Sequence, residues 1–269
     1  MKKATKFYQL NTIYNTNLLN FFFVCITSLI FLKKYCLAED LISGYHFSEP
    51  STQKIQDDDF LNPGFIWVEN GELLWNKKEQ SSQLSCKSCH GAASDMRGIT
   101  LKFPKITKKG DLINLEQQIN ICRNENMSAE TYEPESKNLL ALSVLLYYQS
   151  RGLKQDIKIN EKNKEYFNLG KKLYFKKIGQ MGLSCNQCHD ERVGQNLRAE
   201  KVSQGHINGF PSYLLRWSKI ASVHKRIQFC NEQARAIPFK IFSKEYNALQ
   251  LYMTWRGRGL KIETPAVRK

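Results

Sequence analysis

The sequence predicts an all-α protein built from two tandem copies of one helical domain. The motif C-x-x-C-H occurs at Cys86 and again at Cys185. The residues before each motif also repeat at the same spacing, because GELLWNKK begins at Gly71 and GKKLYFKK begins at Gly170. Apolar residues in these segments recur at helical rather than strand spacing. The repeat therefore indicates a duplicated helical domain.

The first helix of each copy leads toward its C-x-x-C-H motif. Its key positions are Trp67, Gly71, Leu74 and Trp75 in the first copy, and Tyr166, Gly170, Leu173 and Tyr174 in the second. Asn62 and Pro63 are expected to cap and start the first of these helices. A glycine inside a helix costs about 1 kcal/mol relative to alanine, so Gly71 and Gly170 predict close packing against another helix.

The last helix of each copy repeats with a slightly larger spacing. The segment NLLALSVLLYYQSRGLK from Asn138 resembles EYNALQLYMTWRGRGLK from Glu245. The expected N-caps are Ser136 and Ser243, and the expected ends are Gly152 and Gly257.

Two lone cysteines, Cys122 and Cys230, lie farther apart in the sequence than the two motifs do. The second copy therefore carries about nine extra residues between its motif and its lone cysteine, around Gly205–Tyr213.

The C-x-x-C-H motif is typical of covalent c-type haem attachment. Its two thiols add to the haem vinyl groups, and its histidine is the proximal ligand of the iron. The sequence predicts two covalent haems, and hence tandem duplicated cytochrome c-type domains. The residues concerned are Cys86, Cys89 and His90 in the first copy, and Cys185, Cys188 and His189 in the second.

Two other readings of the motif fit less well. One shared zinc ion would need its two C-x-x-C pairs about 12 to 20 residues apart, far closer than they are. A thioredoxin-like redox motif would need a strand before the C-x-x-C, whereas a helical pattern precedes it here.

The N-terminus resembles an export signal. Lysines precede an apolar stretch, Leu18–Leu32, which is shorter than the roughly 20 residues of a membrane-spanning helix, and Cys36–Ala38 offers small residues for cleavage. An uncleaved anchor is the alternative. The prediction is a signal peptide over residues 1–38 and a periplasmic location. The first haem domain is expected over 39–156 and the second over 157–269.

The chain is strongly basic, with a formal net charge of +15 and a pI near 9.4. A positive surface suits an anionic substrate or an acidic partner, and it is also compatible with an ordinary solvated surface. The sequence holds no nucleic-acid-binding motif, so no nucleic-acid partner is expected.

The second axial ligand of each iron is less obvious. Met253 follows His189 at a suitable distance, but it aligns with Leu146 of the first copy, inside the last helix, and is expected in the core. Met127 offers a ligand only to the first haem. His206 and His224 offer one only to the second.

Cysteine is the one candidate ligand type at equivalent positions in both copies, as Cys122 and Cys230. A disulfide joining these two cysteines is the alternative, because exported proteins tend to pair leftover thiols. A duplicated domain instead predicts that each cysteine lies beside its own haem.

The C-terminal part of the chain carries the most specific resemblance to a known family. The segments GHINGFPSYLLRW, HKRIQFCNEQARA, EYNALQLYMTWR and GLKIETPAVR resemble those of SoxA, the dihaem cytochrome c subunit of the SoxAX complex of bacterial sulfur oxidation. One departure is Ile237, where family members commonly carry an acidic residue.

The resemblance implies an L-cysteine S-thiosulfotransferase, which joins thiosulfate oxidatively to a cysteine of the SoxYZ carrier and passes two electrons through haem. It implies a SoxX-type monohaem cytochrome c as partner in a heterodimer. It further implies that Cys230 is the distal ligand of the second haem and the catalytic cysteine, found as a persulfide. Arg226 would bind substrate, and Cys122 would be the distal ligand of the first haem.

The chemistry of the segment agrees with this assignment. Thiosulfate is a dianion, and guanidinium groups present a fixed fork of donors to its sulfonate oxygens. Arg226 precedes Cys230 by four residues, so a helix would place both on one face. Arg235 and Arg256 are further candidates. The alternatives are a dihaem electron carrier without sulfur-transfer chemistry and a dihaem peroxidase.

Overall fold

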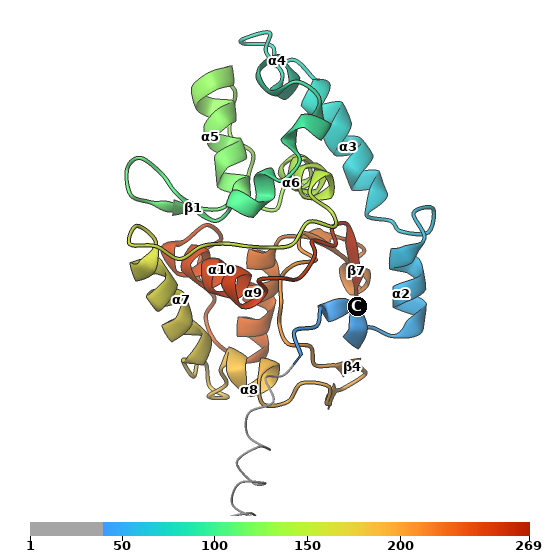
Figure 1. Cartoon of the computed structure of the whole chain (residues 1–269), viewed down its shortest axis with the longest axis vertical. Helices are drawn as coiled ribbons and strands as arrows, with labels where there is room; N and C mark the ends of the chain where they lie inside the picture. Colours follow the sequence, from blue (N-terminus) through green and yellow to red (C-terminus); the bar gives the residue numbers. More distant parts are fainter. Residues whose placement is uncertain (1–39) are drawn as a thin grey trace, which may run out of the picture. The chain divides into compact units, whose positions relative to one another are not determined.

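A computed structural model describes residues 40–269 of the chain, and Leu41–Lys269 form one compact unit (Figure 1). The expected signal peptide and its cleavage site lie outside the described residues. Among the residues that are described, no helix is long and apolar enough to cross a membrane.

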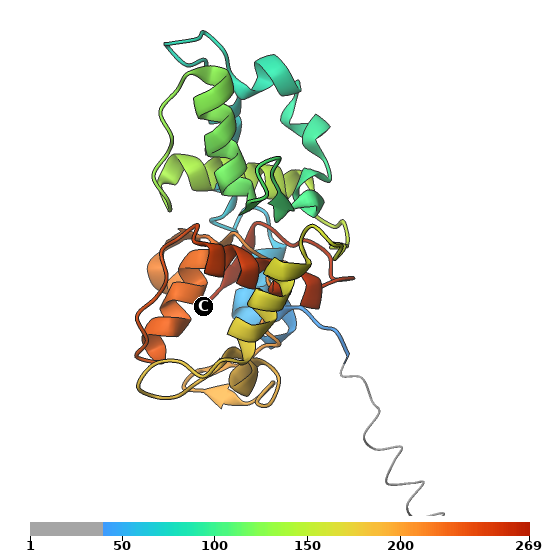
Figure 2. The ribbon, with the colours of Figure 1, turned by 90° about the vertical axis from the view of Figure 1, so that its left-hand side faces the viewer.

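The same order of four helices occurs twice, and the prediction of a duplicated all-α protein is confirmed. The first set is α3 (Phe65–Asn76), α4 (Cys86–His90), α5 (Leu115–Met127) and α6 (Lys137–Gln149). The second set is α7 (Lys164–Phe175), α8 (Cys185–His189), α9 (Val223–Gln233) and α10 (Lys244–Arg256). An additional helix, α2 (Pro50–Asp57), precedes both sets. The helices of each set pack mainly on one another, α3 on α6 (Figure 1) and α7 on α10 (Figure 2).

The two helix crossings depend on the glycines that the sequence singled out. A Cβ atom added to Gly71 would overlap the carbonyl oxygen of Ala141 on α6. A Cβ atom added to Gly170 would likewise overlap the carbonyl oxygen of Ala248 on α10. The expected close packing is confirmed, because only glycine lets the two backbones approach this closely.

Three of the four predicted ends of the last helices are correct, whereas α6 ends at Gln149 with Ser150 as its C-cap, before the expected Gly152. Ser136 and Ser243 are the N-caps of α6 and α10, and Gly257 is the C-cap of α10. Met253 is 8% exposed and belongs to a core cluster with Tyr174, so its assignment to the core is confirmed.

The expected cap at Asn62 is wrong. The α3 helix begins at Phe65 with Gly64 as its N-cap. The Asn62 side chain accepts a hydrogen bond from the Gly64 nitrogen at 2.9 Å and donates one to the Pro265 carbonyl at 2.8 Å. Asn62 therefore connects the start of α3 to the C-terminal segment.

Short strands join the helices, and each is two or three residues long. Two-residue pairs are β1 (Lys105–Ile106) with β2 (Leu112–Ile113), and β3 (Asn196–Leu197) with β4 (Glu200–Lys201). The one three-stranded sheet of the described residues contains β5 (Ser212–Leu214), β6 (Lys219–Ala221) and β7 (Ala266–Arg268).

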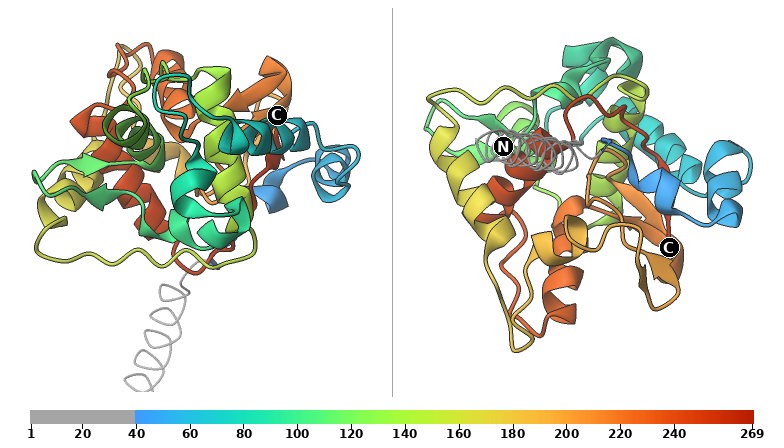
Figure 3. Two further views of the ribbon diagram at one scale, coloured as in Figure 1. Left: turned by 90° about the horizontal axis from the view of Figure 1, so that it is seen from above. Right: turned by 60° about the horizontal axis from the view of Figure 1, so that its bottom comes forward.

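The extra residues of the second copy lead into this three-stranded sheet. In it, β5 pairs antiparallel with β6 and parallel with the C-terminal strand β7. Helix α2 lies against β7, and the Gln56 side chain accepts a hydrogen bond from the Val267 nitrogen at 3.0 Å (Figure 3). The sheet thus fixes the segment that runs into α9, the helix carrying Arg226 and Cys230.

Candidate haem and thiol site

The two C-x-x-C-H motifs form short helices that begin at their first cysteine. Ser85 and Ser88 close the start of α4 with reciprocal hydrogen bonds between the hydroxyl of each and the backbone nitrogen of the other, at 3.0 and 3.2 Å. At α8 the Gln187 side chain accepts from the Ser184 nitrogen at 2.9 Å. These caps hold both cysteines and the histidine of each motif on a little more than one helical turn.

His189 is oriented as a haem ligand requires. Its Nδ1 atom lies 2.7 Å from the Ser203 carbonyl oxygen, which accepts a proton held on Nδ1. The Nε2 lone pair is then free for a metal. Burial lowers the pKa of His189, which keeps the ring neutral. A Cβ atom on Gly205 would overlap the His189 ring, so glycine is needed for the Ser203 segment to lie against it.

An aromatic residue on the first helix of each copy supports the motif. The Trp75 indole donates to the Gly91 carbonyl at 3.0 Å, and its ring centroid lies 5.8 Å from that of His90. The Tyr174 hydroxyl donates to Asp190 at 2.8 Å. Both partners directly follow the histidine of the motif. The donor sets of both motifs therefore fit a c-type haem.

Arg256 is committed to this support rather than free for a substrate. Its guanidinium forms an ion pair with Asp190 and donates to the Gln204 carbonyl at 3.0 Å. It also lies over the Tyr174 ring, 4.5 Å from the centroid. Arg256 thus stabilises the residues around His189.

Cys122 lies on α5 and interacts with the first motif. Burial raises the pKa of the Cys86 thiol to about 11, and the nearby Cys122 thiol acts in the same direction. The Gln118 side chain, one turn earlier on α5, donates a hydrogen bond to the Cys122 sulfur at 3.2 Å. The sulfur therefore has a neutral partner.

Cys230 lies on α9 and interacts with the second motif. Burial raises the pKa of the Cys185 thiol to about 12, with a further contribution from Cys230. The Cys230 side chain is open to solvent on one side. The protein that crowds its other sides raises the pKa of the thiol, whereas the Arg226 guanidinium lowers it.

None of the six cysteines of the described residues forms a disulfide. Cys122 interacts with Cys86, and Cys230 interacts with Cys185 and Cys188. Each lone cysteine thus accompanies its own motif, and the alternative of a Cys122–Cys230 disulfide is wrong.

Arg226 shares one face of α9 with Cys230. The helix covers Val223–Gln233, so the four-residue spacing places the two side chains one turn apart. Arg226 is half-buried, and its Nη1 atom is buried without a hydrogen-bond partner. Its guanidinium lies 5.4 Å from the centroid of the Phe229 ring. An unpaired guanidinium beside a thiol can bind an anion there.

The opposite face of α9 belongs to the core. His224, Ile227 and Asn231 are buried, and the His224 Nδ1 atom accepts a hydrogen bond from the Phe242 nitrogen at 3.2 Å. Burial lowers the pKa of His224 to about 4. His206 also has a partner, the Gln204 side chain at 3.0 Å. Each contact holds one nitrogen of its ring, whereas His224 Nε2 and His206 Nδ1 are buried without a hydrogen-bond partner.

Arg235 lies at the end of α9 in an exposed turn. Its φ angle is 55°, and its carbonyl oxygen accepts from the Gln180 nitrogen at 3.3 Å. Gly179 packs against the Ala234 carbonyl in the same contact. The turn that carries Arg235 is therefore fixed against the loop that leads into the second motif.

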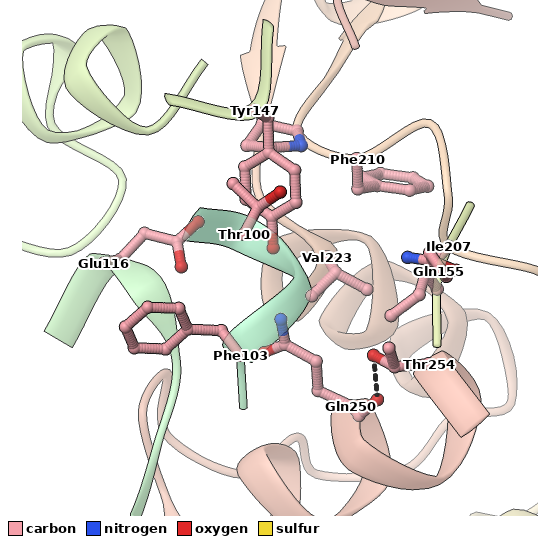
Figure 4. A pocket seen from close by; sticks show the side chains of 11 residues that line it. Thr100, Phe103, Glu116, Tyr147, Gln155, Ile207, Phe210, Val223, Gln250 and Thr254 are labelled. Carbon is pink, nitrogen blue, oxygen red and sulfur yellow. Dashed lines mark hydrogen bonds between the residues drawn. The ribbon is translucent and has the colours of Figure 1, made fainter. Parts of the chain in front are cut away.

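A small cavity lies elsewhere in the described part of the chain. It has a volume of about 10 Å³, room for about one water molecule, and Figure 4 shows Glu116, Tyr147 and Gln250 among its lining residues. Two buried oxygens beside it, Glu116 Oε2 and Thr100 Oγ1, have no hydrogen-bond partner. No cysteine or histidine of the two motifs lines this cavity, so it is not the functional site.

Two contributors to the site are absent from the sequence prediction. The Ser203 carbonyl is a backbone group, and no residue pattern reveals its position. Gln118 could have been found, because the offset between the two lone cysteines pairs it with Arg226.

Comparisons with known proteins agree with this arrangement. The family model "SoxA/TsdA, cytochrome c domain" matches residues 70–155 and again 169–262. The chain is 40% identical to the L-cysteine S-thiosulfotransferase subunit SoxA of Pseudaminobacter salicylatoxidans over 85% of this chain and 81% of that protein. It is 36% identical to the subunit of the same name from Paracoccus pantotrophus, over 86% and 80%.

The crystal structure of SoxXA from P. pantotrophus matches with a TM-score of 0.82 and 36% identity, over 85% of this chain and 87% of that chain. The duplicated helical order, the two motifs and these similarities lead to one conclusion: the chain belongs to the SoxA/TsdA cytochrome c family.

Proposed function

We propose that this chain is the cytochrome subunit of an L-cysteine S-thiosulfotransferase that conjugates thiosulfate to a cysteine of a SoxYZ carrier. The observation that carries the proposal is the unpaired guanidinium of Arg226, one helical turn before Cys230 and next to the second motif. The names of the related proteins support the same activity.

The proposal includes two covalent haems, one in the domain over residues 39–156 and one in the domain over 157–269. Cys86 and Cys89 would hold the first covalently, and His90 and Cys122 would be ligands of its iron. Cys185 and Cys188 would hold the second covalently, and His189 and Cys230 would be ligands of its iron. When bound, haem supplies the route by which the electrons of the reaction leave.

The overall reaction balances as a two-electron oxidation. The carrier thiol and thiosulfate form one sulfur–sulfur bond, release the thiol proton and give up two electrons to a partner cytochrome. The product is a carrier S-thiosulfonate. The conjugated group keeps its sulfonate, so the site binds the same anionic group before and after the reaction.

Arg226 binds this sulfonate with its fork of donors, since its Nη1 atom has no protein partner to exchange. Cys230, in its persulfide form, forms a sulfur–sulfur bond with thiosulfate as two electrons pass to the partner cytochrome; the carrier thiolate then attacks the thiosulfate-derived sulfur, takes the conjugated group and restores the persulfide. The Arg226 charge favours the anionic form of the Cys230 sulfur, which is the reactive one. Arg235 adds a second cation at the exposed end of α9. Arg256 stays with Asp190 and takes no part in binding.

The proposed partners follow from the family. The solved relative is a SoxXA complex, which supports a heterodimer with a SoxX-type monohaem cytochrome c. The SoxYZ carrier and thiosulfate are the substrates, and nucleic acid is not a partner. Export to the periplasm by the N-terminal signal peptide completes the proposal.

The test compares variants of Arg226 and Cys230 in the holo-complex. Arg226→Lys keeps the charge but loses the fork, so thiosulfate conjugation to the carrier should fall at least about tenfold with little change in the haem spectrum. Cys230→Met retains a possible axial ligand, removes the nucleophile and should abolish conjugation.

Arg258→Lys is the matched control, because Arg258 is exposed and lies on Trp255. Normal conjugation by the Cys230→Met variant would leave Cys230 as a ligand only. The chain would then be a dihaem electron carrier without sulfur-transfer chemistry.

A further inference from the structure

The helices that carry the two lone cysteines are in the same register. Asn114 is the N-cap of α5 and accepts from the Gln117 nitrogen at 2.9 Å. Ser222 is the N-cap of α9 and accepts from the Lys225 nitrogen at 3.1 Å. Each cap precedes the lone cysteine of its helix by the same number of positions. The two helices therefore begin at equivalent residues, and each position on one has a defined counterpart on the other.

Gln118 is the counterpart of Arg226. Both precede the lone cysteine of their copy by four residues and share its helix face. Gln118 donates a neutral hydrogen bond to the Cys122 sulfur at 3.2 Å. Arg226 instead leaves Nη1 without a partner and brings a positive charge to Cys230.

The other cation near Cys122 is neutralised. Arg123 forms an ion pair with Glu79 at 2.6 Å and stacks on the Tyr132 ring at 3.6 Å from its centroid. Its Nε atom also donates to the Glu130 carbonyl at 3.1 Å. An anion binding at Cys122 would have to displace these contacts, whereas the Nη1 atom of Arg226 beside Cys230 has no hydrogen bond to give up.

We infer that Gln118 is a positioning residue that holds the Cys122 sulfur as a fixed, unreactive counterpart of Cys230. The side chain one turn before each lone cysteine decides which thiol meets a sulfur oxyanion. Gln118 donates a neutral hydrogen bond to the Cys122 sulfur, whereas Arg226 provides a binding site for an anion beside Cys230. The inference rests on the proposed function for the identity of the anion. The difference between Gln118 at Cys122 and Arg226 at Cys230 does not depend on that function.

Tetrathionate is a suitable probe because it needs no carrier and no electron acceptor. A cysteine thiolate, or the outer sulfur of a cysteine persulfide, attacks one of its two inner sulfurs, the central sulfur–sulfur bond breaks, and thiosulfate leaves. The cysteine then carries a thiosulfonate group that peptide mass spectrometry detects. The rate of labelling is measured separately for the peptides that contain Cys122 and Cys230 in the full chain.

In the unaltered chain, Cys230 should be labelled and Cys122 protected. Gln118→Arg should raise the labelling rate of Cys122 about tenfold or more, because a charge-assisted bidentate contact replaces a neutral one. Asn124→Arg is the matched control: it adds the same charge at an exposed position of α5 and should leave Cys122 protected. Arg226→Gln should lower the Cys230 rate toward that of Cys122.

Equal labelling of Cys122 in the Gln118→Arg and Asn124→Arg variants would overturn the inference. An unchanged labelling rate of Cys230 in the Arg226→Gln variant would overturn it as well. This second experiment remains informative even if the Gln118→Arg variant does not fold. If the complex does not conjugate thiosulfate to the carrier, but labelling of the two cysteines by tetrathionate still depends on arginine, the proposed function is rejected and the inference holds.

Discussion

Glu135 offers the sharpest test of how the first copy supports α9, a helix of the second copy. Its Oε2 atom accepts a hydrogen bond from the Ser222 nitrogen, the N-cap of α9, at 3.3 Å. Ser222 is 2% exposed, so no water can replace this acceptor readily. A carboxylate also interacts favourably with the positive N-terminal end of a helix. Glu135 therefore fixes the start of the helix that carries Arg226 and Cys230.

Glu135→Ala should leave the Ser222 N–H unpaired, at a cost of about 1–3 kcal/mol of unfolding free energy. A loss of about 2 kcal/mol corresponds to a fall in Tm of roughly 4–8 °C for a chain of this size. Because α9 begins at this contact, the absorption spectrum of the second haem should change and that of the first should not.

Glu135→Gln separates the hydrogen bond from the charge. Burial raises the pKa of Glu135 although its bonds to Ser222 act in the opposite direction. Ionisation is thus less favourable in the folded than in the unfolded chain, and stability is lost as the pH rises from about 4.3 through the raised value. The glutamine keeps an acceptor without this cost, so its unfolding free energy should fall less with pH.

The assay is thermal and denaturant unfolding of the holo-protein at several pH values, with absorption spectra of both variants. Glu133→Ala, at an exposed residue two positions earlier, is the control. Unchanged Tm and spectra in Glu135→Ala would refute the reasoning. So would a Glu135→Gln variant with the same pH dependence of stability as the unaltered chain.

Two further predictions concern packing and support. Gly170→Ala gains about 1 kcal/mol of helix propensity, but the added Cβ atom must push α7 away from the Ala248 carbonyl. Such overpacking costs about 1–3 kcal/mol, so the Tm of this variant should fall. The Tm of the control variant Asn168→Ala, at an exposed position of α7, should not fall. Asp190→Asn removes the ion partner of Arg256 and weakens the acceptor of Tyr174, so the second haem's spectrum should change; an unaltered spectrum would contradict the support role.

The sequence predicted best those features for which a residue type has a single structural role. The C-x-x-C-H motifs and the glycines at the helix crossings were found by pattern, and the repeat located Cys122 and Cys230. Gly71 and Gly170 required no knowledge of the partner helix, because a helical glycine already signals a close neighbour. These predictions depend on local spacing alone.

The features that escaped prediction depend on contacts between distant residues. Asn62 is not the cap because α3 begins two residues later than expected, and the bond from the Asn62 amide to the Pro265 carbonyl, 203 residues away, was not predicted. The parallel pairing of β5 with β7 places Ser212 opposite Ala266, and no local pattern encodes pairing between segments so far apart in the sequence. The unpaired state of Arg226 and the paired state of Arg256 depend on which carboxylates lie near each.

The central claim is that Cys230 is the sulfur at which thiosulfate reacts. The most direct measurement is peptide mass spectrometry of the holo-complex after incubation with ³⁴S-labelled thiosulfate and an electron acceptor, before any carrier is added. We predict labelled sulfur on the peptide that contains Cys230 and none on the peptide that contains Cys122. Carrier conjugation that proceeds on later addition of SoxYZ, while Cys230 never carries the label, would contradict the account.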